Sequence, residues 1–146
     1  MKPESGYDLA GKVIGLAMKV HRTLGSGFLE TIYQKALQIE SLRAGFKVEL
    51  EKPIQVLYEG VVVGDFLADI VVNDKLIIEI KAISSLSPAH EVQLVNYLTA
   101  TGENEGLLLN FGRESLEFKK KFRIYKEATS EPFSFRENSV NSVNSV

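Results

Sequence analysis

The sequence contains no cysteine and no tryptophan, and it has only two histidines. Without cysteine, disulfide bonds and zinc sites with thiolate ligands are excluded, and two histidines are too few for most structural zinc sites. A bound metal would therefore be held mainly by oxygen ligands, which favours Mg²⁺ or Mn²⁺. No segment approaches the roughly 20 apolar residues of a membrane-spanning helix, and residues 1–6 lack a hydrophobic signal region. We expect a cytoplasmic protein that does not contact membranes.

The remaining composition is typical of one globular domain. The chain has 146 residues, of which 45% are hydrophobic and 25% charged. Its net charge of −2 argues against strong, indiscriminate phosphate binding, yet residues 113–126 hold six basic and two acidic side chains, a local net charge of +4. This segment is either an edge that faces nucleic acid or an ordinary edge strand protected by lysines.

Apolar spacing predicts two helices before any strand. The first begins after Asp8, a plausible N-cap, and ends at Gly25 and Gly27. The second covers residues 28–44 and ends at Gly45. The residues expected on its buried face are Leu29, Ile32, Ala36 and Ile39.

The middle of the chain changes to β-strand patterns separated by turn signals. The expected strands are residues 47–51, 54–58, 61–72 and 76–83, with Pro53 as one break, followed by a helix at 89–101 and strands at 107–111 and 115–125. This order predicts a mixed α/β fold, in which a helical hairpin precedes a mixed sheet flanked by helices. We expect the domain to cover residues 1–126. Residues 127–146, with their repeated Asn-Ser-Val triplet, are expected to be a disordered low-complexity tail.

Three charged residues lie inside the most apolar predicted strands. Glu79 and Lys81 are two residues apart in one strand and so share a face, and Asp69 lies in the strand before. Burying such charges is costly unless they pair or bind a metal, so a plain Glu79–Lys81 ion pair is the alternative to a metal site. The E-x-K spacing is itself weak evidence, because it recurs at Glu117 and Lys119.

The turn between these two strands decides whether the carboxylates can meet. A three-residue loop pairs Val72 with Leu76 and brings Asp69 opposite Glu79. A two-residue loop would pair Asp69 with Ile78 and turn Glu79 to the other face. A shared site therefore requires the longer loop or a bulge.

Two predicted helices offer further polar residues. His90, Gln93 and Tyr97 share one helical face, as do Glu30 and Tyr33. Each also has an ordinary explanation: amphipathic packing for the tyrosines, a surface amide for Gln93, a helix-start position without function for His90, and interaction with the helix dipole for Glu30.

Together these residues resemble a known family. The segment from Gly27 to Tyr33 matches the G-x-x-E-x-x-Y signature of the GxxExxY proteins, a branch of the PD-(D/E)xK nuclease superfamily. The Gln93-x-x-x-Tyr97 element is similar to one in RecB-type nucleases. The resemblance covers about residues 8–125, with Ala68 in place of the eponymous proline. Its further matching elements are Asp69, Glu79-Ile80-Lys81, His90-Glu91-Val92-Gln93, Asn96-Tyr97-Leu98 and Leu108-Leu109-Asn110-Phe111-Gly112.

The resemblance implies a restriction-endonuclease-like core and a Mg²⁺- or Mn²⁺-dependent nuclease acting on DNA or RNA. Asp69 and Glu79 would be metal ligands, with Glu30 completing or supporting the set, and Lys81 would orient or help deprotonate the attacking water. The residues expected to position the substrate are Gln93, Tyr97, Tyr33 and His90.

Two other functions stay open at this point. One is a non-catalytic module that uses the nuclease-like cleft to hold nucleic acid or a protein partner. The other is metal-dependent chemistry on a different phosphorylated substrate. A protein partner or a homo-oligomer is compatible with each of these functions.

Overall fold

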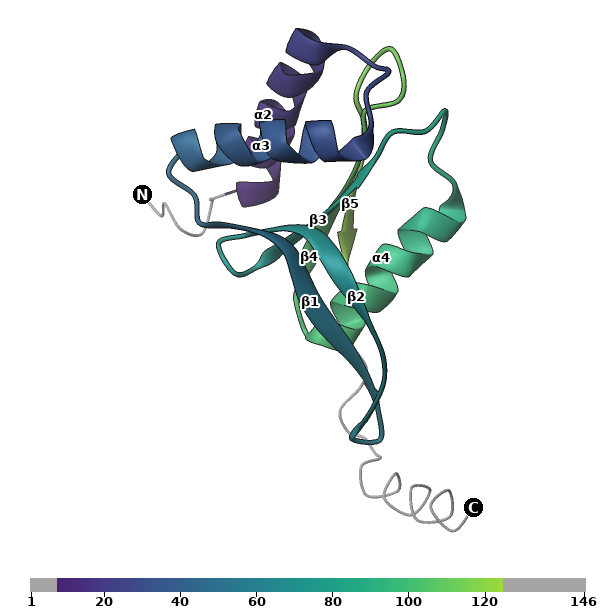
Figure 1. Ribbon diagram of the computed structural model, residues 1–146. Helices are drawn as coiled ribbons and strands as arrows, with labels where there is room; N and C mark the ends of the chain where they lie inside the picture. The colour runs from purple at the N-terminus through teal and green to yellow at the C-terminus, as the bar shows by residue number, and fades with distance from the viewer. Residues whose placement is uncertain (1–7, 125–146) are drawn as a thin grey trace.

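The computed structural model describes residues 8–124, so the expected tail at residues 127–146 lies outside the described residues. The elements follow the predicted order, with two helices, three strands, a helix and two strands (Figure 1). They are α2 (Leu9–Leu24), α3 (Glu30–Arg43), β1 (Val48–Tyr58), β2 (Val61–Val72), β3 (Leu76–Lys81), α4 (Pro88–Thr101), β4 (Glu105–Asn110) and β5 (Glu117–Phe122).

One five-stranded sheet, in the order β1-β2-β3-β4-β5, forms the centre of the fold. β3 and β4 are parallel and the other neighbours are antiparallel, which confirms the predicted mixed sheet. α4 makes the crossover that a parallel pair requires. The expected break at Pro53 is wrong, because β1 runs through this residue. β1 is an edge strand, where the missing N–H of a proline need not cost a ladder hydrogen bond.

Helices cover both faces of the sheet. α2 and α3 lie together against one face, and α4 lies against the other (Figure 1). Along β3, Ile78 and Ile80 belong to the core under α2 and α3, whereas Ile77 belongs to the core under α4. Because neighbouring side chains of a strand alternate between faces, Glu79 and Lys81 are directed to the α4 side.

The predicted buried face of α3 is wrong for three of its four residues, because only Ala36 packs against the core, where it is partly buried. Leu29 is 78% exposed, Ile32 44% and Ile39 49%, whereas Tyr33 and Leu37 are fully buried. The Tyr33 ring stacks on Phe111 with 4.5 Å between ring centroids. A large aromatic ring in this contact removes more apolar surface from water than the smaller side chains of the predicted face. The other buried residues of α3 are Gln34 and Ser41.

The predicted helix ends agree with the structure. The Asp8 carboxylate accepts a hydrogen bond of 2.9 Å from the Gly11 N–H at the start of α2. Gly25 and Gly27 follow α2 with φ angles of 72° and 111°, which side chains rarely adopt. Among residues 8–124, no helix has the length and apolar content needed to cross a bilayer. The cytoplasmic location stays a prediction.

Candidate active site

The register between β2 and β3 brings the strand segments that carry two of the predicted carboxylates next to each other. Val72 pairs with Leu76 and Ile70 with Ile78, which confirms the three-residue loop. These pairs stop at Ile70 and Ile78, each one residue from a predicted carboxylate, Asp69 or Glu79. Two loop residues, Asn73 and Asp74, have φ angles of 52° and 58°, a left-handed conformation that these two residue types tolerate well.

The Asp69 carboxylate reaches across to β3. Its Oδ2 atom accepts a hydrogen bond of 2.7 Å from the backbone N–H of Ile80. The backbone carbonyl of Asp69 accepts a second bond, of 2.9 Å, from Nε2 of Gln34 on α3. Burial raises the pKa of Asp69 above its ordinary value, the Ile80 N–H opposes this rise, and the nearby Glu30 charge adds to it.

Glu79 is the most strongly perturbed of the carboxyl groups. Burial, followed by the charge of Asp69, raises the pKa of Glu79 to about 8. Its Oε2 atom is buried and has no hydrogen-bond partner within residues 8–124. Such an oxygen costs free energy unless it is protonated or meets a cation. The positive charge of Lys81 acts in the opposite direction and lowers the pKa of both Asp69 and Glu79.

Glu30 approaches the same carboxylates from α3. It is the first residue of that helix, and its charge contributes to the raised pKa of both Asp69 and Glu79. The described part of the chain nevertheless has no group of three or more His, Cys, Asp or Glu side chains arranged to hold a metal ion. Mg²⁺ is commonly held by one or two carboxylates together with water, and a role of Asp69 and Glu79 as its ligands stays a prediction. Glu30 stays a predicted third ligand.

α4 places Tyr97 and Gln93 on the side of Glu79. The Tyr97 ring stacks on Phe66 of β2, with 3.5 Å between centroids and 13° between planes. Burial raises the pKa of Tyr97, the charge of Glu79 raises it further, and a hydrogen bond with Gln93 lowers it. The two α4 residues therefore form a connected pair close to the carboxylates.

Tyr33 and His90 make contacts that fix the starts of helices. The buried Tyr33 hydroxyl donates to the Gly25 carbonyl at 2.6 Å and accepts from the Phe28 N–H at 3.1 Å. His90 Nδ1 accepts from the backbone N–H of Ser87 at 3.0 Å and so caps α4. These contacts give both residues a structural role. Their role in substrate positioning stays a prediction.

Sequence reasoning missed two residues beside Asp69. Gln34 could have been found from its position one helical turn after Glu30. Glu51 lies opposite Asp69, between the pairs Leu50–Ile70 and Lys52–Ala68, and its charge contributes to the raised pKa of Asp69. Its φ angle of 49° is uncommon in a strand, and no sequence pattern indicates it.

The basic segment forms the edge strand β5 and is largely compensated by acidic neighbours. Lys121 donates to Glu91 at 2.9 Å, and Lys120 lies 3.6 Å from Asp8 and 3.7 Å from Glu105. This pairing favours the interpretation as a protected edge strand.

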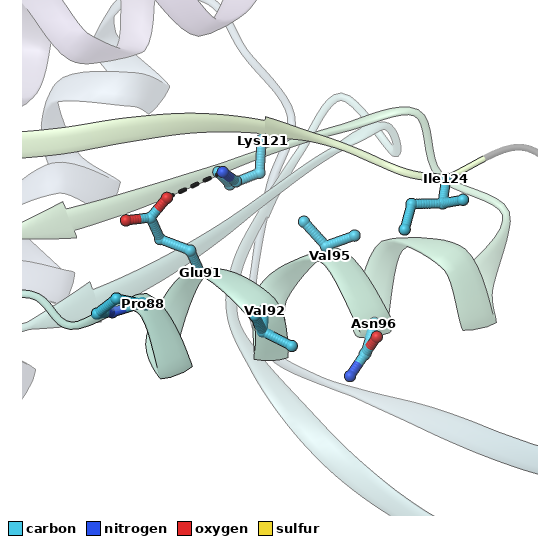
Figure 2. Close-up of a pocket in the computed structure, with 7 residues that line it drawn as sticks. All are labelled: Pro88, Glu91, Val92, Val95, Asn96, Lys121 and Ile124. Carbon is cyan, nitrogen blue, oxygen red and sulfur yellow. Dashed lines mark hydrogen bonds and ion pairs between the residues drawn. The ribbon is translucent and has the colours of Figure 1, made fainter.

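Figure 2 shows the Lys121–Glu91 pair in a groove between α4 and β5, which lacks the predicted catalytic residues. Its volume is about 330 Å³ and its lining residues are Pro88, Glu91, Val92, Val95, Asn96, Lys121 and Ile124.

One comparison with known proteins confirms the superfamily part of the resemblance, while the GxxExxY and RecB-type parts stay predictions. The family model described as the PD-(D/E)XK nuclease superfamily matches residues 7–123. No curated protein matches the chain. Among solved structures, the crystal structure of SSO0001 is similar, with 19% sequence identity, a TM-score of 0.45, and coverage of 92% of this chain and 75% of that one.

Proposed function

Because the chain belongs to the PD-(D/E)XK nuclease superfamily, with a match over residues 7–123, we propose that it is a Mg²⁺- or Mn²⁺-dependent nuclease. Its substrate would be the phosphodiester bonds of DNA or RNA. The observation that supports this most directly is the Asp69 carboxylate bound to the Ile80 N–H, between Glu79 and Lys81, together with the effect of the Asp69 charge on Glu79. The buried, unpartnered Oε2 atom of Glu79 is an oxygen suited to a cation.

The carboxylates would hold the metal ion. Asp69 and Glu79 offer oxygen ligands from adjacent strands, and Glu30 would complete or support the set from α3. A bound divalent ion polarises a phosphoryl oxygen and lowers the pKa of a bound water molecule. Because Glu79 has a pKa of about 8 in the metal-free protein, binding would require this carboxyl group to lose its proton near neutral pH.

Lys81 and the α4 residues would act on the substrate and the water. Lys81 can orient the attacking water, help to deprotonate it, and offset negative charge on the phosphate. Gln93 and Tyr97 lie beside Glu79 and can hydrogen-bond to the nucleic-acid backbone or to the groups around it. The stacking of Tyr97 on Phe66 restricts the position of its hydroxyl group.

A cleavage assay tests the proposal. Purified protein is incubated with single- and double-stranded DNA and RNA in Mn²⁺, alongside Glu79→Ala and Lys81→Ala variants. Lys119→Ala is the matched control, because Lys119 belongs to the second E-x-K sequence but lies exposed on β5. We expect cleavage by the wild type and the control, and its loss in both variants and with a chelator.

The alternative is a non-catalytic module that binds nucleic acid or protein. It predicts binding without cleavage that is unchanged by chelation and by the Lys81→Ala substitution. The salt dependence of that binding would report how many phosphates the protein contacts. Because Lys120 and Lys121 are paired with carboxylates, we expect these two residues of β5 to contribute little to this dependence.

A further inference from the structure

Gln34 is a buried polar residue in direct contact with the backbone of Asp69. Its side chain is 4% exposed, and its Nε2 atom donates a hydrogen bond of 2.9 Å to the Asp69 carbonyl. Gln34 lies one helical turn after Glu30, so the two side chains extend from the same side of α3. The helix therefore reaches the candidate site through a neutral donor as well as through a carboxylate.

The strand β2 is irregular where Gln34 contacts it. The β2–β3 pairs run from Val72–Leu76 to Ile70–Ile78 and stop before Asp69. The β1–β2 pairing includes residues on both sides of Asp69 but omits Asp69 itself. The Asp69 carbonyl is thus bonded to a helix side chain at a position where the strand ladders are interrupted.

At this interruption, the Ile80 N–H bonds to the Asp69 carboxylate and not to a backbone carbonyl of β2. In an uninterrupted antiparallel ladder of the same register, Ile80 would lie opposite Ala68 and its N–H would pair with backbone of β2. Instead, Oδ2 of Asp69 accepts from this N–H at 2.7 Å. The same residue thus contacts α3 through its carbonyl and β3 through its carboxylate.

From these contacts we propose that Gln34 is a positioning residue, which holds the Asp69 peptide so that its carboxylate is set for cation binding. The cation-binding part of this inference rests on the proposed nuclease function. Removing the amide leaves the Asp69 carbonyl without its donor in a buried setting. Residues that support metal ligands in this way typically change metal affinity by about 10–100-fold when they are replaced.

The test compares Gln34→Met with wild type by amide NMR and by Mn²⁺ titration. The Ile80 amide reports its hydrogen bond to Asp69 directly and needs no metal. In Gln34→Met we expect its resonance to shift and its hydrogen exchange to accelerate at least about tenfold, and we expect Mn²⁺ to bind about 10–100-fold more weakly. Ser41→Ala is the matched control, because the buried Ser41 hydroxyl on the same helix has no hydrogen-bond partner within residues 8–124.

The outcomes separate this inference from the proposed function. An unchanged Ile80 amide in Gln34→Met overturns the role of Gln34, even if the variant is less stable. A wild-type protein that neither binds Mn²⁺ nor cleaves overturns the proposed function, while the Ile80 amide still decides whether Gln34 positions Asp69. Should Gln34→Met fail to fold, Gln34→Leu replaces it, because a leucine side chain also has no donor. The same change at Ile80 is then expected, and its absence overturns the inference.

Discussion

The Asp69 carboxylate accepts a hydrogen bond of 2.7 Å from the backbone N–H of Ile80, the residue between Glu79 and Lys81. This bond joins the aspartate of one strand to the E-x-K segment of the next. A displacement of β2 relative to β3 would therefore move Asp69 away from both Glu79 and Lys81. The geometry of the candidate site depends on this strand contact as much as on the charged side chains.

Glu79→Gln should stabilise the metal-free protein at alkaline pH. In the folded protein the pKa of Glu79 is about 8, against an ordinary value of 4.5. Between these values the folded state keeps a proton that the unfolded state has lost, so the contribution of Glu79 to stability falls as pH rises through this window. Glutamine stays neutral, so the variant should have a higher Tm than wild type at about pH 8 and a flatter dependence on pH.

Thermal unfolding in a chelator, measured from about pH 5 to about pH 9, checks this prediction. Glu114→Gln, at an exposed position, is the control for a lost surface charge. The raised pKa of Asp69 should leave some pH dependence in the Glu79→Gln variant. Parallel Tm curves for wild type and Glu79→Gln would contradict a raised pKa at this residue.

The Tyr97→Phe variant distinguishes the contribution of the stacked ring from that of the hydroxyl group. Phenylalanine keeps the ring on Phe66, so the free energy of unfolding should change by less than about 0.5 kcal/mol. If the hydroxyl positions the substrate beside Glu79, the KM for nucleic acid should rise several-fold. Steady-state kinetics and urea unfolding of the same preparations measure the two effects.

Tyr97→Ala is the companion variant. It removes the ring as well and should destabilise the protein by about 2–4 kcal/mol, because a half-buried aromatic side chain is lost. A KM unchanged in Tyr97→Phe would leave Tyr97 with a packing role alone.

The sequence limited the register of β2 and β3 to two alternatives, and the structure has the one with the three-residue loop. Val72 and Leu76 mark the ends of two apolar strands, and the loop between them leaves few pairings that bury both. The face of Glu79 follows from alternation along β3, whereas β2 is irregular at Asp69, which neither ladder includes. Local pattern therefore predicts the strands, but not the irregularity at Asp69 that sets the position of its carboxylate.

Contacts between distant elements could not be read in the same way. The sequence predicted Ile32 and Ile39 as buried on α3, but the structure buries Tyr33 and Gln34. Their partners, Phe111 and the Asp69 carbonyl, are far away in the sequence. Periodicity gives the faces of a helix, but the face that is buried depends on shapes and hydrogen bonds supplied by the rest of the fold.

Tyr33→Phe should lower the stability of the protein by about 1–3 kcal/mol. The substitution keeps the ring stacked on Phe111 but removes the hydroxyl that bonds to Gly25 and Phe28. Both backbone partners belong to the turn before α3, so they lose a buried partner. Urea unfolding measures the change. An unaltered free energy of unfolding would show that the turn holds its conformation without the hydroxyl group.

Asn110 ties the loop after Lys81 to the end of β4. Its fully buried side chain accepts from the N–H of Ile83 at 2.9 Å and donates to the Ile83 carbonyl and to Glu117, both at 3.0 Å. Asn110→Leu removes these bonds and leaves buried backbone groups without partners. It should therefore destabilise the protein by at least about 2 kcal/mol.

Asn110→Asp tests the same contacts through pH. An aspartate there would face the Ile83 carbonyl and the Glu117 carboxylate, so its pKa should be raised and the protein should become less stable as pH rises through that range. Urea unfolding at about pH 5 and about pH 8 should show a larger loss at the higher pH than in Asn110→Leu. Equal losses for Asn110→Asp at both values would mean that the loop moves away from the charge. In that case Asn110 would not hold the segment between Lys81 and α4 in one position.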